Sequence, residues 1–409
     1  MPTKLKIEHV TKIFGDRPDD ALQRLAAGES KAEIFEATGH TVGVNDASFE
    51  VEQGQIFVVM GLSGSGKSTL IRLLNGLIRP TSGKILIDDV DVASCSADTL
   101  REVRRNKIAM VFQHFALFPH MSVADNAAYG LKVKGVPAAQ RRESALEALT
   151  QVGLAAHADT MPAELSGGMQ QRVGLARGLA TDPEVLLMDE PFGALDPLIR
   201  REVQDELLRL QRTLRKTIVF ITHDLNEALL LGDRIAIMKD GEIVQIGNAQ
   251  EIVDTPANDY VSAFVADIDR GRVFTADTVA SEPLTLQLGS DTAESAQQSM
   301  EDNNRSSAYV MDGNAIAGIV TYQDAVAAAR DDNVSLEDAM TADFPTADSG
   351  AVLHELYGAA SNGLPIAVTD DRNRLVGVIE AGAVLAQLSG DAAPADASSA
   401  DGNQLRDKA

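Results

Sequence analysis

Residues 61–68 read Gly-Leu-Ser-Gly-Ser-Gly-Lys-Ser, and this segment constrains the fold more than any other part of the chain. It follows an apolar run at 56–60 with the length of a buried strand, and it precedes a helical pattern at 69–75. A glycine-rich turn between a strand and a helix lets backbone N–H groups point at an anion near the helix N-terminus. The segment therefore predicts a phosphate-binding loop in an α/β domain.

The residue types in this loop indicate a site for ATP and Mg²⁺. We expect Lys67 to supply a point charge to the β- and γ-phosphate oxygens, and Ser68 to contact Mg²⁺. The glycines leave space for the phosphates to approach the backbone closely. The predicted ATP-binding residues of the loop are Gly61, Ser63, Gly64, Ser65, Gly66, Lys67, Ser68 and Thr69.

Four further apolar runs, separated by helical patterns, predict a mostly parallel sheet that is covered on both faces. They are residues 108–112, 185–188, 217–222 and 234–238. Asp189 and Glu190 follow the second run, and His223 follows the third. Ligands bind at the carboxyl edge of such sheets, so we expect Asp189 to hold Mg²⁺ and Glu190 to act as the general base on water. A lone histidine is more often structural, but its place at this edge favours a catalytic role for His223.

Residues 165–172 read Leu-Ser-Gly-Gly-Met-Gln-Gln-Arg and open another helix. Taken locally, Ser166 is a helix N-cap, and the helix has one apolar face, formed by Met169, Val173, Ala176 and Ala180. A capped core helix would explain this pattern. Two glycines in a first turn are nevertheless costly unless a ligand must approach the backbone, and a helix N-terminus binds anions.

The segment at 165–172, between the phosphate loop and the acid pair, resembles the signature of the ABC ATPase superfamily. The resemblance covers residues 1 to about 265 and includes every motif in order. It implies an α/β P-loop NTPase fold, namely an ABC ATPase domain with a helical subdomain. It also implies a head-to-tail homodimer in which Ser166, Gly167 and Gly168 of one subunit close over the γ-phosphate bound by Lys67 of the other.

The same resemblance implies the roles of four further residues. Gln113 is expected to sense the γ-phosphate and Mg²⁺, and to take part in catalysis. Asp196 is expected at the dimer seam, His223 at the γ-phosphate, and Phe14 stacked on adenine. The catalytic set that we predict is Glu190, His223, Lys67 and Gln113, and the metal-binding set is Ser68, Gln113 and Asp189.

An insertion at residues 16–43 follows Phe14 and contains two helical patterns, at 21–25 and 31–35. Together with residues 61–67 and 196–200, it makes the chain similar to the ATP-binding subunits of glycine betaine/proline betaine importers. That resemblance implies the import of an osmoprotectant, powered by ATP hydrolysis. Alternatively, the insertion is a surface addition without a functional role.

The composition changes near residue 270: residues 1–270 carry a net charge of −9, and residues 271–409 carry −15. A weak internal repeat relates residues 308–320 to residues 366–379, which predicts two copies of a small α/β unit. We expect an ABC ATPase domain at 1–270, a regulatory module at 271–388, and a disordered acidic tail at 389–409, which has almost nothing to bury.

The repeat resembles a tandem cystathionine-β-synthase-type (CBS) module, which implies an α+β fold. Thr321 and Asp324 fit the form in which such modules bind the ribose and phosphate of a regulatory nucleotide. Alternatively, these two residues form a capping box for the helix expected at 324–330. The second copy has Glu380 and Ala383 at the matching places, so we expect at most one nucleotide site.

Charge and hydropathy exclude several classes of function. The net charge of −24 disfavours nucleic acid as a partner and is typical of solubility or of adaptation to a salty cytoplasm. A single cysteine excludes an internal disulfide, the N-terminus does not resemble a signal peptide, and no apolar run approaches the ~20 residues of a membrane helix. We therefore expect a peripheral subunit on the cytoplasmic face of the membrane.

Such a subunit needs partners in the membrane. We expect an integral-membrane permease that docks near residues 114–121, which are rich in apolar side chains, and an indirect link to an extracytoplasmic substrate-binding protein. Two alternatives stay open: an importer ATPase for choline, carnitine or an amino acid, and a non-transport ABC ATPase that acts on DNA or ribosomes.

Overall fold

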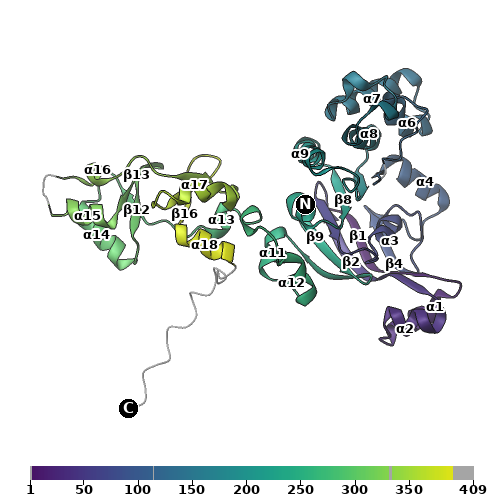
Figure 1. The fold of residues 1–409 in the computed structure, drawn as a ribbon, viewed down its shortest axis with the longest axis horizontal. Coiled ribbons are helices and arrows are strands. Elements are labelled where there is room, and N and C mark those ends of the chain that lie inside the picture. Colours follow the sequence, from purple (N-terminus) through teal and green to yellow (C-terminus); the bar gives the residue numbers. More distant parts are fainter. Residues whose placement is uncertain (1, 114, 331–333, 390–409) are drawn as a thin grey trace, which may run out of the picture. The chain divides into compact units, whose positions relative to one another are not determined.

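The computed structural model describes residues 2–113, 115–330 and 334–389. The chain divides into two compact units, Met1–Ala266 and Asp267–Ala409 (Figure 1). The tail predicted at 389–409 lies outside the described residues, except for Ser389 at the end of a helix. No helix in the described part of the chain is both long and apolar enough to cross a bilayer.

A six-stranded sheet forms the centre of the first unit. All its strands are parallel to their neighbours except the edge strand β10. In spatial order the strands are β10 (Glu242–Gly247), β9 (Arg234–Lys239), β3 (Ile56–Met60), β8 (Thr217–Thr222), β7 (Val185–Asp189) and β6 (Ile108–Val111). Every residue of β3 and β8 is buried, which explains their continuous apolar sequences. The five strands predicted from the sequence are confirmed, with ends that differ by one residue at most.

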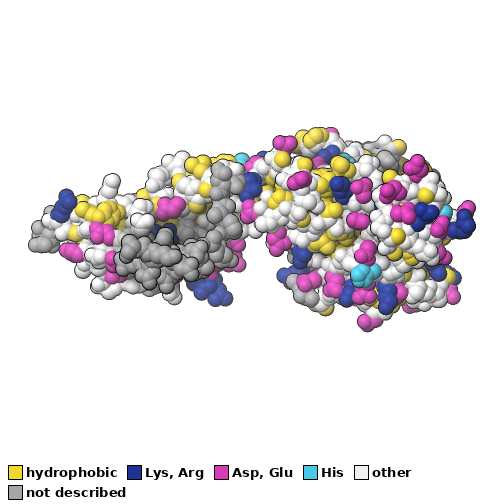
Figure 2. Space-filling view, turned by 90° about the horizontal axis from the view of Figure 1, so that it is seen from below, with side chains coloured by type: hydrophobic (Ala, Val, Ile, Leu, Met, Phe, Trp, Pro, Cys, Tyr) yellow, Lys and Arg dark blue, Asp and Glu magenta, His cyan; other side chains and the backbone are white. Residues whose placement is uncertain are grey.

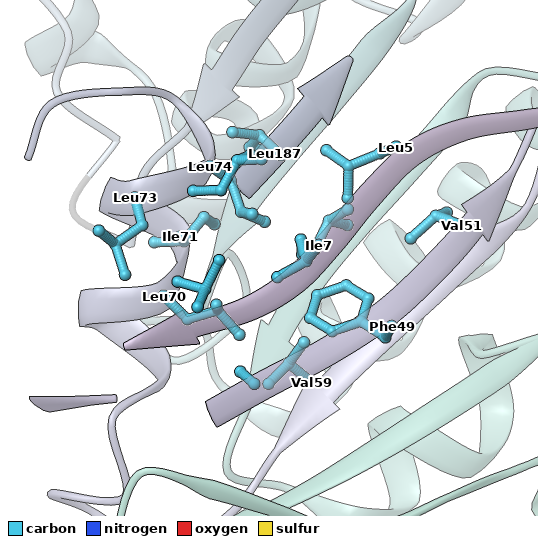
Figure 3. Packing of buried hydrophobic residues seen from close by; sticks show 14 of the residues in the cluster. Leu5, Ile7, Phe49, Val51, Val59, Leu70, Ile71, Leu73, Leu74 and Leu187 are labelled. Carbon is cyan, nitrogen blue, oxygen red and sulfur yellow. The ribbon is translucent and has the colours of Figure 1, made fainter. Parts of the chain in front are cut away.

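A second, antiparallel sheet packs over the helix that follows the phosphate loop. Its strands are, in order, β2 (Thr41–Glu52), β1 (Thr3–Phe14), β4 (Ser82–Ile87) and β5 (Val90–Asp91). Figure 3 shows Ile7 and Phe49 of this sheet facing Leu70 of helix α3 (Lys67–Leu74) and Val59 of β3. Each fully buried side chain of this size contributes roughly 1.5–3 kcal/mol. This core therefore fixes the loop and its helix between the two sheets.

The remaining helices of the first unit cover the parallel sheet or form a separate helical lobe, which Figure 1 draws around α7 and α8. Their bounds are α4 (Ala97–Asn106), α5 (Val123–Ala127), α6 (Tyr129–Val133), α7 (Ala138–Gln151), α8 (Gly167–Leu179), α9 (Pro197–Leu214), α10 (Leu225–Leu231), α11 (Ala249–Asp254) and α12 (Asp259–Val265). Asn126 is fully buried in this lobe, and its amide nitrogen donates to the carbonyls of Phe118, Met121 and Ser122. The segment before α5 is thereby fixed to the lobe.

The insertion forms two helices, α1 (Pro18–Ala26) and α2 (Lys31–Thr38), at the end of the β1–β2 hairpin. A capping box between Ser30 and Glu33 starts α2, and Gly39 ends it in the left-handed conformation, with φ of 71°. Ala21 and Ile34 are fully buried in a small cluster with residues of β1 and β2. The insertion is therefore packed onto the hairpin by a core of its own.

The second unit contains two three-stranded sheets of the same topology. Their strands are β11 (Thr285–Gln287), β12 (Ser307–Asp312) and β13 (Ala315–Thr321) in one, and β14 (Thr346–Asp348), β15 (Ile366–Thr369) and β16 (Leu375–Ile379) in the other. In each sheet the first pair of strands is parallel and the second is antiparallel. The two segments of the sequence repeat occupy the corresponding strand pairs β12–β13 and β15–β16.

Helices cover these sheets, and the two copies exchange their leading segments. The helices are α13 (Ala276–Val279), α14 (Ala293–Asp302), α15 (Tyr322–Ala328), α16 (Leu336–Ala339), α17 (Tyr357–Ala360) and α18 (Ala381–Ser389). Ser281, which precedes the first copy, pairs with Val378 of the second, and Thr341, which precedes the second, pairs with Ile319 of the first. The buried Tyr309 hydroxyl also donates to the carbonyl of Pro365, at 2.7 Å. The copies therefore form one module.

Candidate functional site

A cavity of about 580 Å³ opens over the phosphate loop in the first unit. The loop contributes Ser63, Gly64, Gly66, Lys67, Ser68 and Thr69 to its lining. Phe14 from β1, Glu190 from the end of β7 and His223 from the end of β8 line the same cavity. Residues that the sequence spreads over more than 200 positions therefore meet at the carboxyl edge of the parallel sheet.

The loop glycines have backbone conformations and surroundings that exclude a side chain. Gly61 has φ of +154°, and a Cβ there would lie 2.2 Å from the carbonyl oxygen of Met238. Gly66 has φ of +107°, and its Cβ would lie 2.4 Å from the carbonyl oxygen of Gly43. Both positions combine a left-handed conformation with a backbone contact, so glycine is required there for two independent reasons.

Lys67 is nearly buried, with 5% of its surface exposed, at the floor of this cavity. Its ammonium donates to the carbonyls of Gly61 at 2.8 Å and Leu62 at 3.0 Å. Burial lowers the pKa of Lys67, and the nearby Glu190 and Asp189 act in the opposite direction. The loop thus holds a partly desolvated cation beside backbone positions that are open to an anion.

The acid pair and its neighbours form a second group of polar residues at the cavity. One oxygen of Glu190, Oε2, lies 3.0 Å from Nδ1 of His223 and accepts a hydrogen bond from Nε2 of Gln113 at 3.4 Å. Glu190 has φ of +42°, which is uncommon for a residue with a side chain and typical of functional sites. Gln113, Glu190 and His223 follow three neighbouring strands, so the sheet brings them together as the sequence predicts.

Asp189 lies beside this group and is half-buried. Burial raises the pKa of Asp189, and so does the charge of Glu190, whereas Arg72 and Lys67 lower it. A bound cation would compensate for this unfavourable charge. The hydroxyl of Ser68, the carboxylate of Asp189 and the amide oxygen of Gln113 are hard oxygen donors of the kind that Mg²⁺ prefers, with phosphate and water completing its shell. The residues present therefore fit Mg²⁺.

Phe14 forms the side wall of the cavity, with 40% of its surface exposed. Gly43 makes this position possible, because a Cβ at residue 43 would lie 2.8 Å from Cε2 of the Phe14 ring. The ammonium of Lys12 lies 5.2 Å from the ring centroid. An exposed aromatic ring at the rim of a phosphate site is suited to stack on a flat base.

Several lining residues carry no signal in the sequence. Thr41, Val42 and Gly43, the last three residues of the predicted insertion, form the start of β2 and line the cavity. Leu62 is 58% exposed at its rim. Helices α1 and α2 separate these residues from Phe14 along the chain. Only the pairing of β1 with β2, in which Phe14 lies opposite Thr41, brings them to the same wall.

The residues expected on the opposing subunit lie outside the lining of this cavity. Ser166 caps α8 by accepting from the N–H of Met169 at 3.3 Å, and Asp196 caps α9 by accepting from the N–H of Ile199 at 3.1 Å. A Cβ at Gly168 would lie 2.2 Å from Cγ2 of Ile199, so helix packing requires this glycine. The sequence argument that a ligand explains both glycines is therefore incomplete. Gly167 is exposed and has ordinary clearance.

The second unit has a cavity of its own, of about 610 Å³, with Thr321, Tyr322 and Arg305 in its lining. Thr321 caps α15 by accepting from the N–H of Asp324 at 3.2 Å, and its hydroxyl donates to the Asp324 carboxylate at 2.5 Å. Thr321 is therefore the N-cap of α15, and its bond from the N–H of Asp324 is one of the two backbone hydrogen bonds of the capping box that the sequence suggested. The helix accordingly begins at Tyr322, two residues before the predicted start.

Comparisons with known proteins identify the family. A family model described as ABC transporter matches residues 44–193. The chain is 50% identical over 392 residues to the glycine betaine transport ATP-binding protein OpuAA of Bacillus subtilis, a match that covers 95% of this chain and 93% of the relative. The chain belongs to this family of ABC transporter ATP-binding proteins. It is also 49% identical to the glycine betaine/carnitine transport ATP-binding protein GbuA of Listeria monocytogenes, over 95% of this chain and 98% of the relative.

Solved structures support the same assignment for the ATPase domain. A dimeric post-hydrolysis state of an ATP-binding cassette with ADP and Pi is 33% identical, with a TM-score of 0.50, and the match covers 60% of this chain and 98% of that one. A second neighbour, part of an ABC transporter complex of Clostridium perfringens, is 27% identical with a TM-score of 0.53, over 63% and 93% of the two chains. This member of the ABC family is therefore an ATP-hydrolysing subunit of a P-loop NTPase fold.

Proposed function

We propose that this ABC subunit powers the import of glycine betaine or proline betaine through a separate membrane permease. The observation that carries the proposal is identity of about half over nearly the whole chain to proteins named for glycine betaine transport. The match extends through the insertion and the second unit, beyond the residues 44–193 that match the general ABC model. Carnitine stays as an alternative solute, since one of these relatives is also named for it.

Hydrolysis of ATP would use the polar group at the carboxyl edge of the sheet. Glu190 accepts a proton from the attacking water, while His223 and Gln113 hold its carboxylate in place. Lys67 and the loop N–H groups stabilise negative charge on the phosphates. Ser68, Asp189 and Gln113 would hold Mg²⁺, which neutralises charge on the phosphate oxygens when bound. Phe14 would stack on the adenine.

A homodimer would complete the site. Ser166 and Gly167 are exposed and lie outside the lining of their own subunit's cavity, which supports their action on ATP bound to a second subunit. Asp196, at the exposed start of α9, would lie at the seam. A solved relative of the cassette is described as dimeric, in keeping with this arrangement.

The segment at 114–121 would transmit contact with the permease on the cytoplasmic face of the membrane. His114 lies outside the described residues, and Phe115 and Ala116 both have positive φ, of 56° and 48°. Arg177 of α8 holds them by donating to both carbonyls, at 3.0 Å and 2.5 Å. Because Ser166 caps the start of α8, displacement of this segment would reach the proposed dimer contact. The extracytoplasmic substrate-binding protein would act only through the permease.

The second unit would be a tandem CBS module that regulates transport. Its two sheets of equal topology support this assignment, and its cavity beside Thr321 is large enough for a regulatory nucleotide. Asp324 would meet the ribose only if it released its hydrogen bond to Thr321.

Reconstitution into lipid vesicles with the permease and the binding protein tests the transport proposal. We expect ATP-dependent uptake of labelled glycine betaine, competition by unlabelled proline betaine, and no uptake with Glu190→Gln. Equal or faster uptake of carnitine, choline or an amino acid would identify a different solute. Co-purification tests the class, because nucleic acid or ribosomes in place of a permease would contradict a transport role.

A further inference from the structure

Arg200, in the first turns of α9, lies between two loops of the ATPase unit. Its Nη2 donates to the carbonyl of Leu195 at 3.2 Å, and its Nη1 donates to the carboxylate of Asp224 at 3.3 Å. Leu195 belongs to the turn that ends at Asp196, and Asp224 directly follows His223. One planar guanidinium therefore contacts both the turn proposed at the dimer seam and the loop that carries the histidine.

Glu227 lies under the same histidine loop and is 5% exposed. Its carboxylate accepts from the hydroxyl of Thr222 at 2.6 Å and from Nε2 of Gln204, on α9, at 3.1 Å. The Thr222 hydroxyl in turn accepts from the N–H of Asp224 at 3.0 Å. The backbone on both sides of His223 is thus held by hydrogen bonds that lead to Glu227 and, through Gln204, to α9.

The contact between Arg200 and Glu227 themselves is incomplete. Nε of Arg200 is buried and lies 3.8 Å from Oε1 of Glu227, beyond hydrogen-bond distance, and it has no hydrogen-bond partner within the described part of the chain. A buried N–H without an acceptor is unfavourable, so a small shift of α9 toward Glu227 would gain a charge-assisted hydrogen bond. The Arg200–Glu227 contact would therefore be strengthened by such a shift.

We propose that Arg200 and Glu227 are positioning residues that couple the Leu195–Asp196 turn to His223. Contact of a second subunit at this turn shifts α9, closes the Arg200–Glu227 contact and fixes the histidine beside Glu190, whose carboxylate lies 3.0 Å from it. The inference rests on the proposed role of His223 in hydrolysis. It adds a route by which dimer contact reaches that residue inside a single subunit.

The test measures ATP hydrolysis, ATP affinity and thermal unfolding of the full-length protein for Arg200→Lys, Glu227→Gln and His223→Ala. Lysine keeps the charge of Arg200 but cannot contact both loops at once, and glutamine keeps the shape of Glu227. We expect each of these two variants to lower kcat about tenfold, with KM and melting temperature close to those of the wild type. Arg201→Ala, at the exposed neighbouring position on α9, is the matched control and should not change kcat.

Double variants separate coupling from simple stabilisation. If Arg200 and Glu227 act through His223, adding Arg200→Lys to His223→Ala should not lower the single-turnover rate further. Multiplied rate losses in the double variant, or a wild-type kcat in both single variants, would overturn the coupling. A lower melting temperature with unchanged kcat would show that Arg200 and Glu227 have only a structural role. A wild-type rate in His223→Ala would instead overturn the proposed role of the histidine itself.

Discussion

The two units each contain a cavity of similar volume, about 580 Å³ over the phosphate loop and about 610 Å³ in the second unit, but the polar groups in them differ in kind. In the first, two loop glycines have a left-handed φ and backbone contacts that no other residue would fit, and the ammonium of Lys67 is buried. In the second, polar side chains bond to each other or to nearby backbone: Thr321 to Asp324, Tyr322 to Glu301, and Arg305 to the carbonyl of Glu282.

The comparison shows that volume says little about what a cavity binds. Polar side chains in both cavities have internal partners, Lys67 and Glu190 in the first and Thr321 and Arg305 in the second. Only the first adds loop glycines at which a side chain would clash with the fold, and a phosphate can approach their backbone closely. Acidic side chains are visible on the described surface of both units (Figure 2). Substitutions should therefore have large effects in the first cavity and small ones in the second.

The largest effect is expected for Glu190→Gln. The amide cannot accept a proton from water, while Lys67 and the loop still bind ATP, so hydrolysis should fall by at least about a hundredfold and an ATP-bound dimer should accumulate. Phosphate release and size-exclusion chromatography with ATP measure both. A monomeric variant, or one that hydrolyses ATP normally, would show that another group is the base.

Gly66→Ala should have the next largest effect. The new Cβ would meet the carbonyl of Gly43 at 2.4 Å, so both sheets must shift around the loop. We expect a loss of ATP binding and destabilisation of about 1–3 kcal/mol beyond the control. Gly135→Ala is that control, because Gly135 also has positive φ, +81°, but has no atom within 4 Å of the new Cβ. Equal effects at the two positions would mean that backbone conformation alone is responsible.

These glycines illustrate what could be predicted from the sequence. The phosphate loop, the acid pair and the histidine follow local patterns of strand, turn and helix, and the parallel sheet brings them together. The need for glycine at 168 depends on Ile199 of another helix, and the wall at 41–43 depends on the pairing of β1 with β2. The exchange of segments between the two copies in the second unit could not be predicted from the sequence either, because it depends on contacts between residues distant in the chain.

Asp324→Ala tests the second cavity and should have a modest effect. If the Asp324 carboxylate serves mainly as acceptor for the Thr321 hydroxyl, its loss should cost about 0.5–1 kcal/mol in unfolding of the second unit, because the cap bond from the backbone N–H of residue 324 stays. Calorimetric titration of residues 267–389 with adenine nucleotides, cyclic dinucleotides included, tests whether Asp324 binds the ribose of a regulatory nucleotide. Binding that disappears in this variant would favour the nucleotide site, and the absence of heat with every nucleotide would contradict a regulatory ligand.

A smaller effect should appear in the pH dependence of unfolding for Glu227→Gln. Burial raises the pKa of Glu227, with Asp224 acting in the same direction and Thr222, Arg200 and His223 opposing. A carboxyl with a raised pKa binds its proton more tightly when folded, so wild-type stability should fall as pH rises from the ordinary glutamate pKa through the raised value.

The glutamine variant lacks this proton, so its stability relative to the wild type should rise over the same pH range and then stay constant. Urea unfolding at a series of pH values measures the difference. Glu143→Gln, at an exposed position on α7, is the control for the loss of one charge. A difference that does not change with pH, or that changes equally in the control, would show that burial of Glu227 has no consequence for folding.

The smallest expected difference between the two units is in how their melting temperatures respond to salt. Residues 271–409 carry a net charge of −15, against −9 for the nearly twofold longer residues 1–270, so self-repulsion per residue is greater in the second unit. Screening at about 1 M KCl shortens the reach of such repulsion to roughly 3 Å. We therefore expect the melting temperatures of separately expressed units to rise between low salt and molar KCl, and to rise more for the second. An equal rise with sucrose would point to general exclusion of solutes from the surface, and a flat or falling melting temperature would leave solubility as the role of the acidic residues.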